Sequence, residues 1–364
     1  MGNGREKPMT LRDVAERAGV GVSTVARVVH GNGYVSEETR ERVETVIREG
    51  GFRLNAVASG LKRRRTTTLG TLVHETLPNP FFAEVALGVE HEASERGYNV
   101  LVYNAHGSAE HEREGVEAFL SQQVAAIVFA KTVDPDNVEL AWRAGVAVVE
   151  VEKPLLGIGG SVLVDNYVGA TAAMSHLADL GHTEIGFLGE PAREPAAAGH
   201  PVDRVVNERF TGYRDVLQER GLVEDETLVV LGDYHSDAGW PSLRTGYDYM
   251  TRLLEQRPTV TGVFAGSDLL AAGALQLLYE RRIRVPDEMS VIGFDDTFAR
   301  HLAPALTTVR QPMFKMGVEA AALGMRLAGV RRRQSREVWL STDLVVRGST
   351  AAPPGGRRLT RVAP

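Results

Sequence analysis

The sequence lacks the features that mark several large classes of protein. It contains no cysteine, which excludes disulfide bonds and any zinc or iron–sulfur site with cysteine ligands. It has no run of about 18 apolar residues that could span a membrane and no apolar signal segment, so we expect a cytoplasmic protein without a membrane partner. Motifs of phosphate-binding loops, zinc proteases and α/β-hydrolases are absent as well, so we predict no enzyme activity, metal or cofactor.

Charge is distributed unevenly along the 364 residues, which are too many for one compact core. Residues 1–65 carry 13 Lys and Arg against 8 Asp and Glu, and the remainder carries 28 against 39, so that +5 and −11 make up the net charge of −6. A cationic N-terminal region on an anionic remainder predicts that this end of the chain meets a polyanion.

Two short helices joined by a glycine turn are predicted close to the N-terminus. Thr10 and Asp13 have the spacing of a capping box at the start of the first helix, and Gly19 ends it. A second helix follows over residues 22–30, with Gly21 in the N-cap position. This order is typical of the helix-turn-helix unit, whose second helix enters the major groove of DNA.

The second predicted helix has an apolar face and a polar face. Val25, Val28 and Val29 would point inward. The outward face consists of Val22, Ser23, Ala26, Arg27 and His30. Serine can bond a base or a phosphate and arginine can reach guanine, so this face suits DNA. The alternative is an ordinary amphipathic hairpin with a solvated arginine.

A third helix and a short conditional helix complete the N-terminal region. Ser36 is the predicted N-cap of the third helix, and Val43, Val46 and Ile47 would face inward. The bundle would enclose little core, so we expect it to need a partner or DNA for order. Residues 55–61 are too few for a stable isolated helix. The basic run 62–65 suits phosphates or, alternatively, forms a solvated linker.

The rest of the chain alternates short apolar runs with helical patterns, and the pattern runs twice. Such alternation predicts two parallel β-sheets with helical crossovers. Ligands bind such folds at the carboxyl ends of the strands, here in a cleft between two sheets. The helices are predicted over residues 82–96, 110–121, 137–144, 170–180, 210–220, 243–255 and 269–281.

Nearly the whole chain resembles one family. TLRDVAERAGVGVSTVARVVHG, VSEETRERV and NAVASGLKRRRTTTLG are similar to the headpiece and hinge of the LacI/GalR family of transcriptional repressors. NPFFAEVALGVEHEASERGYNVLVYNA and VDNYVGATAAMSHLADLGHTEIGFLG are similar to its body, which is like a periplasmic sugar-binding protein. The resemblance implies an α-helical helix-turn-helix headpiece plus an α/β body of two parallel-sheet subdomains. It also implies a homodimer on a pseudo-palindromic double-stranded DNA operator at the nucleoid, and a small-molecule effector, in first place a carbohydrate.

The pattern and the resemblance together predict four segments. These are a DNA-binding headpiece over 9–54, a hinge helix and linker over 55–68, an effector-binding and dimerisation domain over 69–348, and a disordered tail over 349–364. The chain would cross between subdomains near Val164, Gln311 and Ser341. One subdomain then comprises 69–164 plus 312–341, and the other 165–311 plus 342–348.

The resemblance also implies a set of DNA-contacting residues. Val22 and Ser23 match base-reading positions, and Leu61 matches the leucine that wedges into the central base step. The full set is Thr10, Val22, Ser23, Thr24, Arg27, His30, Asn55, Ala58 and Leu61. Gly21, Ala26 and His30 stand where the family usually has Ser, Ser and Asn, so no operator sequence is predicted.

An effector site is implied in the cleft. Asp295 in GFDD and Arg209 in RFTGY match effector-binding residues, and Tyr234 matches a ring-stacking aromatic. The full set is Phe81, Phe82, Arg209, Tyr234, Ser267 and Asp295, with the two phenylalanines at the opposite lip. Structural alternatives are a core role for Phe82, a loop anchor for Tyr234 and a turn cap for Asp295. Residues 191–208 and 235–244 exceed the family norm and flank the cleft, either as specificity loops or as surface insertions.

Three other functions are weighed against the sugar-controlled repressor. A nucleobase-type co-repressor could use the same carboxylate, arginine and aromatic groups. A sugar-binding receptor without a regulatory role would have the same body but no headpiece. An enzyme would need a catalytic set that the sequence does not contain.

Overall fold

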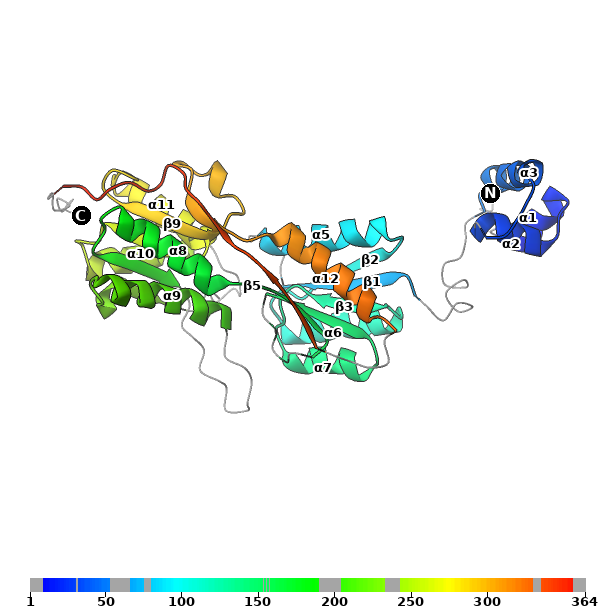
Figure 1. Cartoon of the computed structure of the whole chain (residues 1–364), viewed down its shortest axis with the longest axis horizontal. Coiled ribbons are helices and arrows are strands. Elements are labelled where there is room, and N and C mark those ends of the chain that lie inside the picture. Colours follow the sequence, from blue (N-terminus) through cyan, green and yellow to red (C-terminus); the bar gives the residue numbers. More distant parts are fainter. Residues whose placement is uncertain are drawn as a thin grey trace, which may run out of the picture. The chain divides into compact units, whose positions relative to one another are not determined.

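The computed structural model describes residues 9–30, 32–52, 66–74, 80–152, 154, 156, 158–189, 204–232, 243–329 and 335–355, with the side chains of residues 30 and 204–207 left out. The chain divides into two compact units (Figure 1), Met1–Arg65, here called the head, and Thr66–Pro364, here called the body. Within the described part of the chain, no helix has the length and apolar character needed to cross a membrane.

The head is a three-helix bundle of α1 (Leu11–Ala18), α2 (Val22–His30) and α3 (Glu37–Gly50). Its buried core consists of Val14, Ala15, Ala18, Val25, Val28 and Val43. Val29, Val46 and Ile47 pack against this core while partly exposed. The predicted inward faces of α2 and α3 are therefore confirmed.

Two helix starts in the head differ in how they are capped. The Thr10 hydroxyl accepts a hydrogen bond from the Asp13 N–H at 3.3 Å, and the Asp13 carboxylate accepts one from the Thr10 N–H at 2.7 Å. This capping box is the predicted one. Ser36 stands at the N-cap of α3 but makes no capping bond, because its hydroxyl donates to Thr39 Oγ1 at 2.8 Å instead.

The first sheet of the body has six parallel strands in the order β11-β5-β4-β3-β1-β2. The strands are β1 (Thr68–Val73), β2 (Asn99–Asn104), β3 (Ala126–Phe129), β4 (Ala147–Val151), β5 (Gly160–Val164) and β11 (Arg336–Leu340). α5 (Phe81–Glu95) and α12 (Met313–Leu327) cover one face, and α6 (Ala109–Ser121) and α7 (Pro135–Arg143) cover the other (Figure 1). These elements form the N-terminal subdomain.

The second sheet has the order β12-β10-β9-β8-β6-β7. Its strands are β6 (Ile185–Gly189), β7 (Val229–Leu231), β8 (Gly262–Ala265), β9 (Ser290–Asp295), β10 (Thr307–Arg310) and β12 (Asp343–Val345). α8 (Asn166–Asp179) and α9 (Arg204–Arg220) cover one face, and α10 (Leu243–Gln256) and α11 (Asp268–Glu280) the other. The predicted parallel sheets are confirmed with one exception: β12 runs antiparallel to β10, since a link of two residues from β11, and no helical crossover, leads into it.

Three connections join the two subdomains, at residues 165, 311–312 and 341–342, beside the predicted positions Val164, Gln311 and Ser341. The predicted helices agree closely with observed ones except at two starts, and α12 (Met313–Leu327) was not predicted. α8 begins at Asn166 rather than residue 170, because the Asp165 carboxylate caps it by accepting from the Val168 N–H at 2.9 Å. α9 begins at Arg204 rather than Phe210.

The predicted disordered tail is wrong for residues 349–355. Ser349 is fully buried, and its hydroxyl donates to the Val291 carbonyl at 2.6 Å. The Ala351 carbonyl accepts from His182 Nε2 at 2.9 Å, and its N–H donates to Ser290 Oγ at 3.0 Å. Small residues let this segment lie on the sheet with its backbone groups satisfied. The rest of the tail and the predicted hinge helix at 55–61 lie outside the described residues.

Each subdomain contains one helix pair in which backbones touch. A Cβ atom added at Gly317 of α12 would overlap the Val85 carbonyl oxygen of α5, and one at Gly88 would overlap that of Phe314. Gly246 and Gly273 make the equivalent contact between α10 and α11. These glycines are therefore required by close approach rather than by backbone conformation.

Candidate functional site

The predicted DNA-contacting residues of α2 lie on the outside of the head. Val22 is 45% exposed, and Ser23 and Arg27 are exposed as well. Val25 and Val28 hold the opposite side of α2 in the core. Since one helix face presents these groups together, α2 can enter a groove without disturbing the bundle.

The remaining predicted DNA contacts are less well placed or not described. Thr24 is half-buried, and the Thr10 hydroxyl is already engaged with Asp13, to which it donates at 2.7 Å. His30 ends α2, and its side chain is not described. Asn55, Ala58 and Leu61 lie outside the described residues, so their roles stay predictions.

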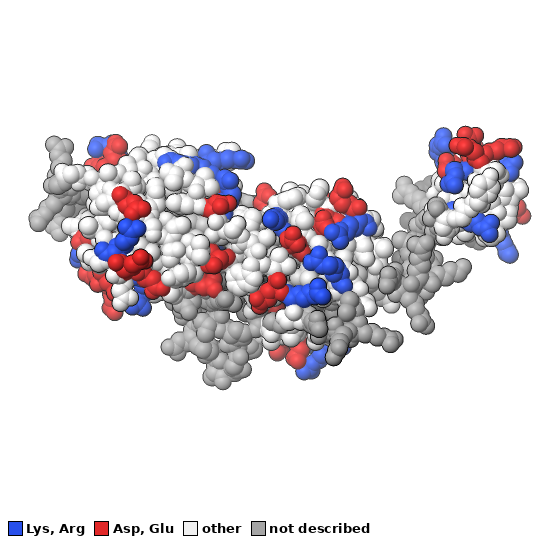
Figure 2. Space-filling model, in the orientation of Figure 1, with Lys and Arg blue, Asp and Glu red and all other residues white. Residues whose placement is uncertain are grey.

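The helices α2 and α3 of the head differ in their balance of charge. The described residues of the head hold six basic and seven acidic side chains, so the positive balance of the sequence comes from the chain before residue 9 and after residue 52. α2 carries Arg27 and no acidic side chain, whereas α3 carries three arginines and five glutamates, and Figure 2 shows acidic and basic atoms close together on the head. The acidic residues of α3 are Glu37, Glu38, Glu41, Glu44 and Glu49. This polarity favours an approach of α2, and not α3, to a polyanion.

In the body, Arg209 of α9 is held from three sides at the carboxyl ends of the strands. Its Nε donates to Asn166 Oδ1 at 2.9 Å, and its Nη1 donates to the Gly266 carbonyl at 2.7 Å. Its guanidinium carbon lies 3.8 Å from the centre of the Phe294 ring. These contacts fix the plane of the guanidinium, and Nη2 is its one nitrogen that makes no hydrogen bond to the described residues.

Arg209 Nη2 meets carboxylates from both subdomains. It lies 3.7 Å from Asp295 Oδ1, at the end of β9, and 3.6 Å from Glu152 Oε1, just after β4. Asp295 and Glu152 both have positive φ, 118° and 67°, a conformation that costs non-glycine residues energy. The predicted pair Arg209 and Asp295 is thus brought together, with Glu152 as a third member.

Burial perturbs the acids around this arginine. Asp295 is only 5% exposed, and burial raises its pKa to about 7, against the opposing effect of Arg209 and with a further increase from Glu152. Gln311 Nε2 donates to Asp295 Oδ1 at 2.7 Å. Asp268 accepts from Thr308 Oγ1 at 2.6 Å, and burial together with the charge of Asp295 raises its pKa to about 8. Asp295, Asp268 and Glu152 therefore place three carboxyl groups at this corner of the body.

The other predicted effector residues have structural roles or are not described. Phe81 and Phe82 are 2% and 4% exposed in the core of the N-terminal subdomain, which agrees with the structural alternative for Phe82, and their role at the lip of the cleft stays a prediction. They face inward because that side of α5 packs on the sheet. Ser267 caps α11 by accepting from the Leu270 N–H at 3.3 Å. Tyr234 and most of the two predicted insertions lie outside the described residues.

Three residues of this arrangement were not among the predicted site residues, namely Glu152, Asn166 and Gln311. Each comes directly after a strand or at a crossing between subdomains, which is the signal that could have found them. Among the described residues, no group of three or more His, Asp or Glu side chains is placed to hold a metal ion.

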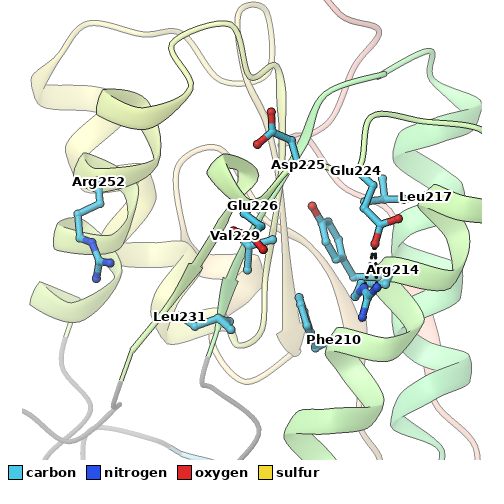
Figure 3. A pocket seen from close by; sticks show the side chains of 10 residues that line it. Phe210, Arg214, Leu217, Glu224, Asp225, Glu226, Val229, Leu231 and Arg252 are labelled. Atoms are coloured by element: carbon cyan, nitrogen blue, oxygen red, sulfur yellow. Dashed lines mark hydrogen bonds and ion pairs between the residues drawn. The ribbon is translucent and has the colours of Figure 1, made fainter.

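A separate cavity of about 530 Å³ opens between α9 and β7 (Figure 3). Phe210, Leu217, Val229 and Leu231 form its apolar wall. At its rim Arg214 pairs with Glu224 at 2.9 Å. Arg209 and Asp295 are not among its lining residues, so it is distinct from the predicted effector cleft.

Two known protein families match separate parts of the chain. Residues 10–55 match the model of bacterial regulatory proteins of the lacI family, and residues 174–350 match the periplasmic binding protein-like domain. The regulator CelR of Thermobifida fusca is 36% identical over 357 residues, covering 95% of this chain and 99% of CelR. The chain belongs to the LacI family.

Solved structures extend the family match to the fold. A CelR–cellobiose complex has a TM-score of 0.67 at 33% identity, covering 94% of this chain and 99% of that chain. A Lac repressor dimer bound to operator and an anti-inducer has a TM-score of 0.79 at 25% identity, covering 95% and 100%. LacI-family relatives of this length are helix-turn-helix transcriptional regulators, and the helical head with its two-sheet body is the same architecture.

Proposed function

We propose that this LacI-family member is a sequence-specific DNA-binding repressor whose operator affinity is controlled by a sugar or sugar derivative. The observation that carries the effector half of this proposal is the position of Arg209, which faces Asp295 of its own subdomain and Glu152 of the other. A ligand that binds Arg209 therefore touches both halves of the cleft. The cellobiose complex of CelR supports a carbohydrate as the class of effector.

Control of DNA affinity follows if the effector binds one arrangement of the subdomains more tightly than another. A ligand can shift such an equilibrium only by its difference in affinity for the two states. The two heads of a dimer read half-sites about one helical turn apart, so a change in the spacing of their hinges alters affinity. We assign the hinge to residues 55–61, with Leu61 inserted into the minor groove.

An exposed apolar surface supports a homodimer. Leu101 and Val102 of the edge strand β2 are 38% and 56% exposed, and Leu87 of the neighbouring α5 is 53% exposed. Apolar side chains gathered on an edge strand mark an interaction surface. We place the dimer contact of the body here.

The test combines DNA selection with ligand binding on the full-length protein. Duplexes selected from a random pool should contain an inverted repeat, and their affinity should change with one class among sugars, sugar phosphates, nucleosides and nucleobases. A ligand at 100 times its dissociation constant adds about 2.7 kcal/mol of stability, which a melting assay detects. Asp295→Ala should abolish the response. A response to nucleobases alone would replace the sugar with a nucleobase co-repressor.

The hinge assignment has its own test. Leu61→Ala should leave the melting of the body unchanged while weakening binding to the selected operator, because the inserted side chain is what holds the kinked DNA. Unchanged operator affinity would contradict the hinge assignment and leave the DNA-binding role of α2 in place.

A further inference from the structure

Two buried polar atoms beside Asp295 have no hydrogen-bond partner in the described part of the protein. One is Arg209 Nη2, whose distances of 3.6 and 3.7 Å to its two carboxylates are too long for hydrogen bonds. The other is Gln311 Oε1, on a side chain only 3% exposed. Buried polar groups are normally satisfied, so a donor and an acceptor left open at one site point to a ligand.

Both open atoms belong to side chains that meet the same carboxylate oxygen. Gln311 Nε2 donates to Asp295 Oδ1 at 2.7 Å, and Arg209 Nη2 lies 3.7 Å from that oxygen. A hydroxyl group both donates and accepts. Its oxygen can accept a hydrogen bond from Arg209 Nη2 while its hydrogen is donated to Gln311 Oε1 or to a carboxylate oxygen. An ionised carboxylate or a phosphate dianion accepts only, and it would leave the Gln311 oxygen unsatisfied.

The charge of the site also favours a hydroxyl group over an anionic group. One guanidinium, that of Arg209, faces two carboxylates. Among the described residues, the cations Arg310 and Arg347 are paired with Asp296, each at 2.7 Å. An anionic effector group at Arg209 would therefore meet like charge in a site where Arg209 is 11% and Glu152 13% exposed, so solvent screens little of the repulsion.

We infer that Glu152 is a specificity-determining residue that restricts this part of the cleft to uncharged hydroxyl groups and excludes phosphorylated or acidic sugars. The inference rests on the proposed function, since it names the chemical class of the effector. Glu152 achieves this by bringing a second carboxylate to Arg209 from the other subdomain.

The test measures the affinity of the full-length protein for matched neutral and anionic ligands. The probes are glucose with glucose 6-phosphate and glucuronate, ribose with ribose 5-phosphate, and cellobiose with cellobionate. The neutral member of the bound series should bind at least tenfold more tightly. In Glu152→Gln that ratio should fall at least fivefold, mainly through tighter binding of the anionic member. Glu90→Gln removes the same charge at an exposed site on α5 and should leave the ratio unchanged.

A pH profile separates this role from a structural one. The groups that face Asp295 are Arg209, Glu152, Gln311 and the neighbouring Asp268. The nearby charge of Glu152 raises the pKa of Asp295, so Glu152→Gln should lower it. Affinity for the neutral sugar should rise with pH as Asp295 ionises near pH 7 in the wild type, and at lower pH in the variant.

Each contrary outcome is distinct. A preference of the wild type for the anionic members would overturn the role of Glu152 and leave the proposed function intact. An unchanged ratio and an unchanged pH profile in Glu152→Gln would overturn it equally. If none of the probes binds, both the sugar effector and this inference are overturned.

Discussion

The head and the body bury very different side chains. The buried core of the head contains only valine and alanine, whereas the body buries large rings such as Phe129, Phe187, Phe264 and Tyr213. Burial of apolar area is the main stabilising term, at about 25 cal/mol per Å². The head, for which we propose DNA binding, is thus intrinsically the weaker unit, and the body is the more stable one. Such a division suits a regulator whose DNA-bound form is ordered by its partner.

The largest expected effect would weaken the stable body itself, through a steric clash between two of its helices. Gly317→Ala places a methyl group against the Val85 carbonyl and forces α12 away from α5, which should cost about 3 kcal/mol. All three tryptophans, Trp142, Trp240 and Trp339, belong to the body, so their fluorescence during denaturation follows that unit. The control is Gly324→Ala in the same helix, where the new Cβ meets the Ala126 Cβ at 3.1 Å and no backbone. Equal losses in the two variants would refute the close-approach argument.

The next effect would destabilise the head further and leave the body unchanged, which would sharpen the contrast between them. Val25→Ala removes a fully buried side chain from a small core and should destabilise the head by about 2 kcal/mol. Circular dichroism of the helices should show an earlier first transition, while the fluorescence transition of the body stays in place. Val22→Ala makes the same chemical change at a 45% exposed position, so it should spare stability and weaken operator binding instead. A stability loss in both variants would contradict the assigned faces of α2.

A smaller effect concerns the helix caps of the head. Thr10→Ala removes a capping box and should cost about 1 kcal/mol. Ser36→Ala removes a hydroxyl in the same position of α3 that makes no capping bond, so its cost should be clearly less. Thermal unfolding of the two variants side by side decides the matter, and an equal loss would mean that Ser36 caps α3 in solution.

The smallest effect is a pH dependence confined to the body. Burial lowers the pKa of His182 below the usual 6.5, and the neutral ring donates to the Ala351 carbonyl. Stability from the neutral ring is therefore complete above pH 6.5 and is lost as pH falls from there through the folded-state pKa. The melting difference between wild type and His182→Gln should shrink over that range. Asp268 and Asp295 have raised pKa values, which stabilise the folded state as pH falls, opposite to the effect of His182. Both are present in wild type and variant, so their contributions cancel in the melting difference. A difference that is constant with pH would show that His182 does not titrate there.

Local patterns predicted much of the fold. The capping box at Thr10, the inward valines of α2 and the doubled strand–helix alternation all rest on periodicity or on contacts a few residues apart. The family motifs brought Arg209 and Asp295 into one prediction. The sequence could not decide between the two roles weighed for Phe82, because an aromatic residue at the start of a helix looks the same in sequence whether the helix turns it toward the sheet or toward the cleft.

The sequence by itself determined that a helix-turn-helix head precedes a two-sheet body, because short-range periodicity and caps decide which elements form. Only the tertiary structure decided that Glu152, Arg209 and Gln311 share one carboxylate-rich corner, since three crossings between subdomains bring together residues far apart in the chain. It also decided that residues 349–355 belong to the body, because burial on a sheet outweighs the local signal of a polar, proline-containing tail.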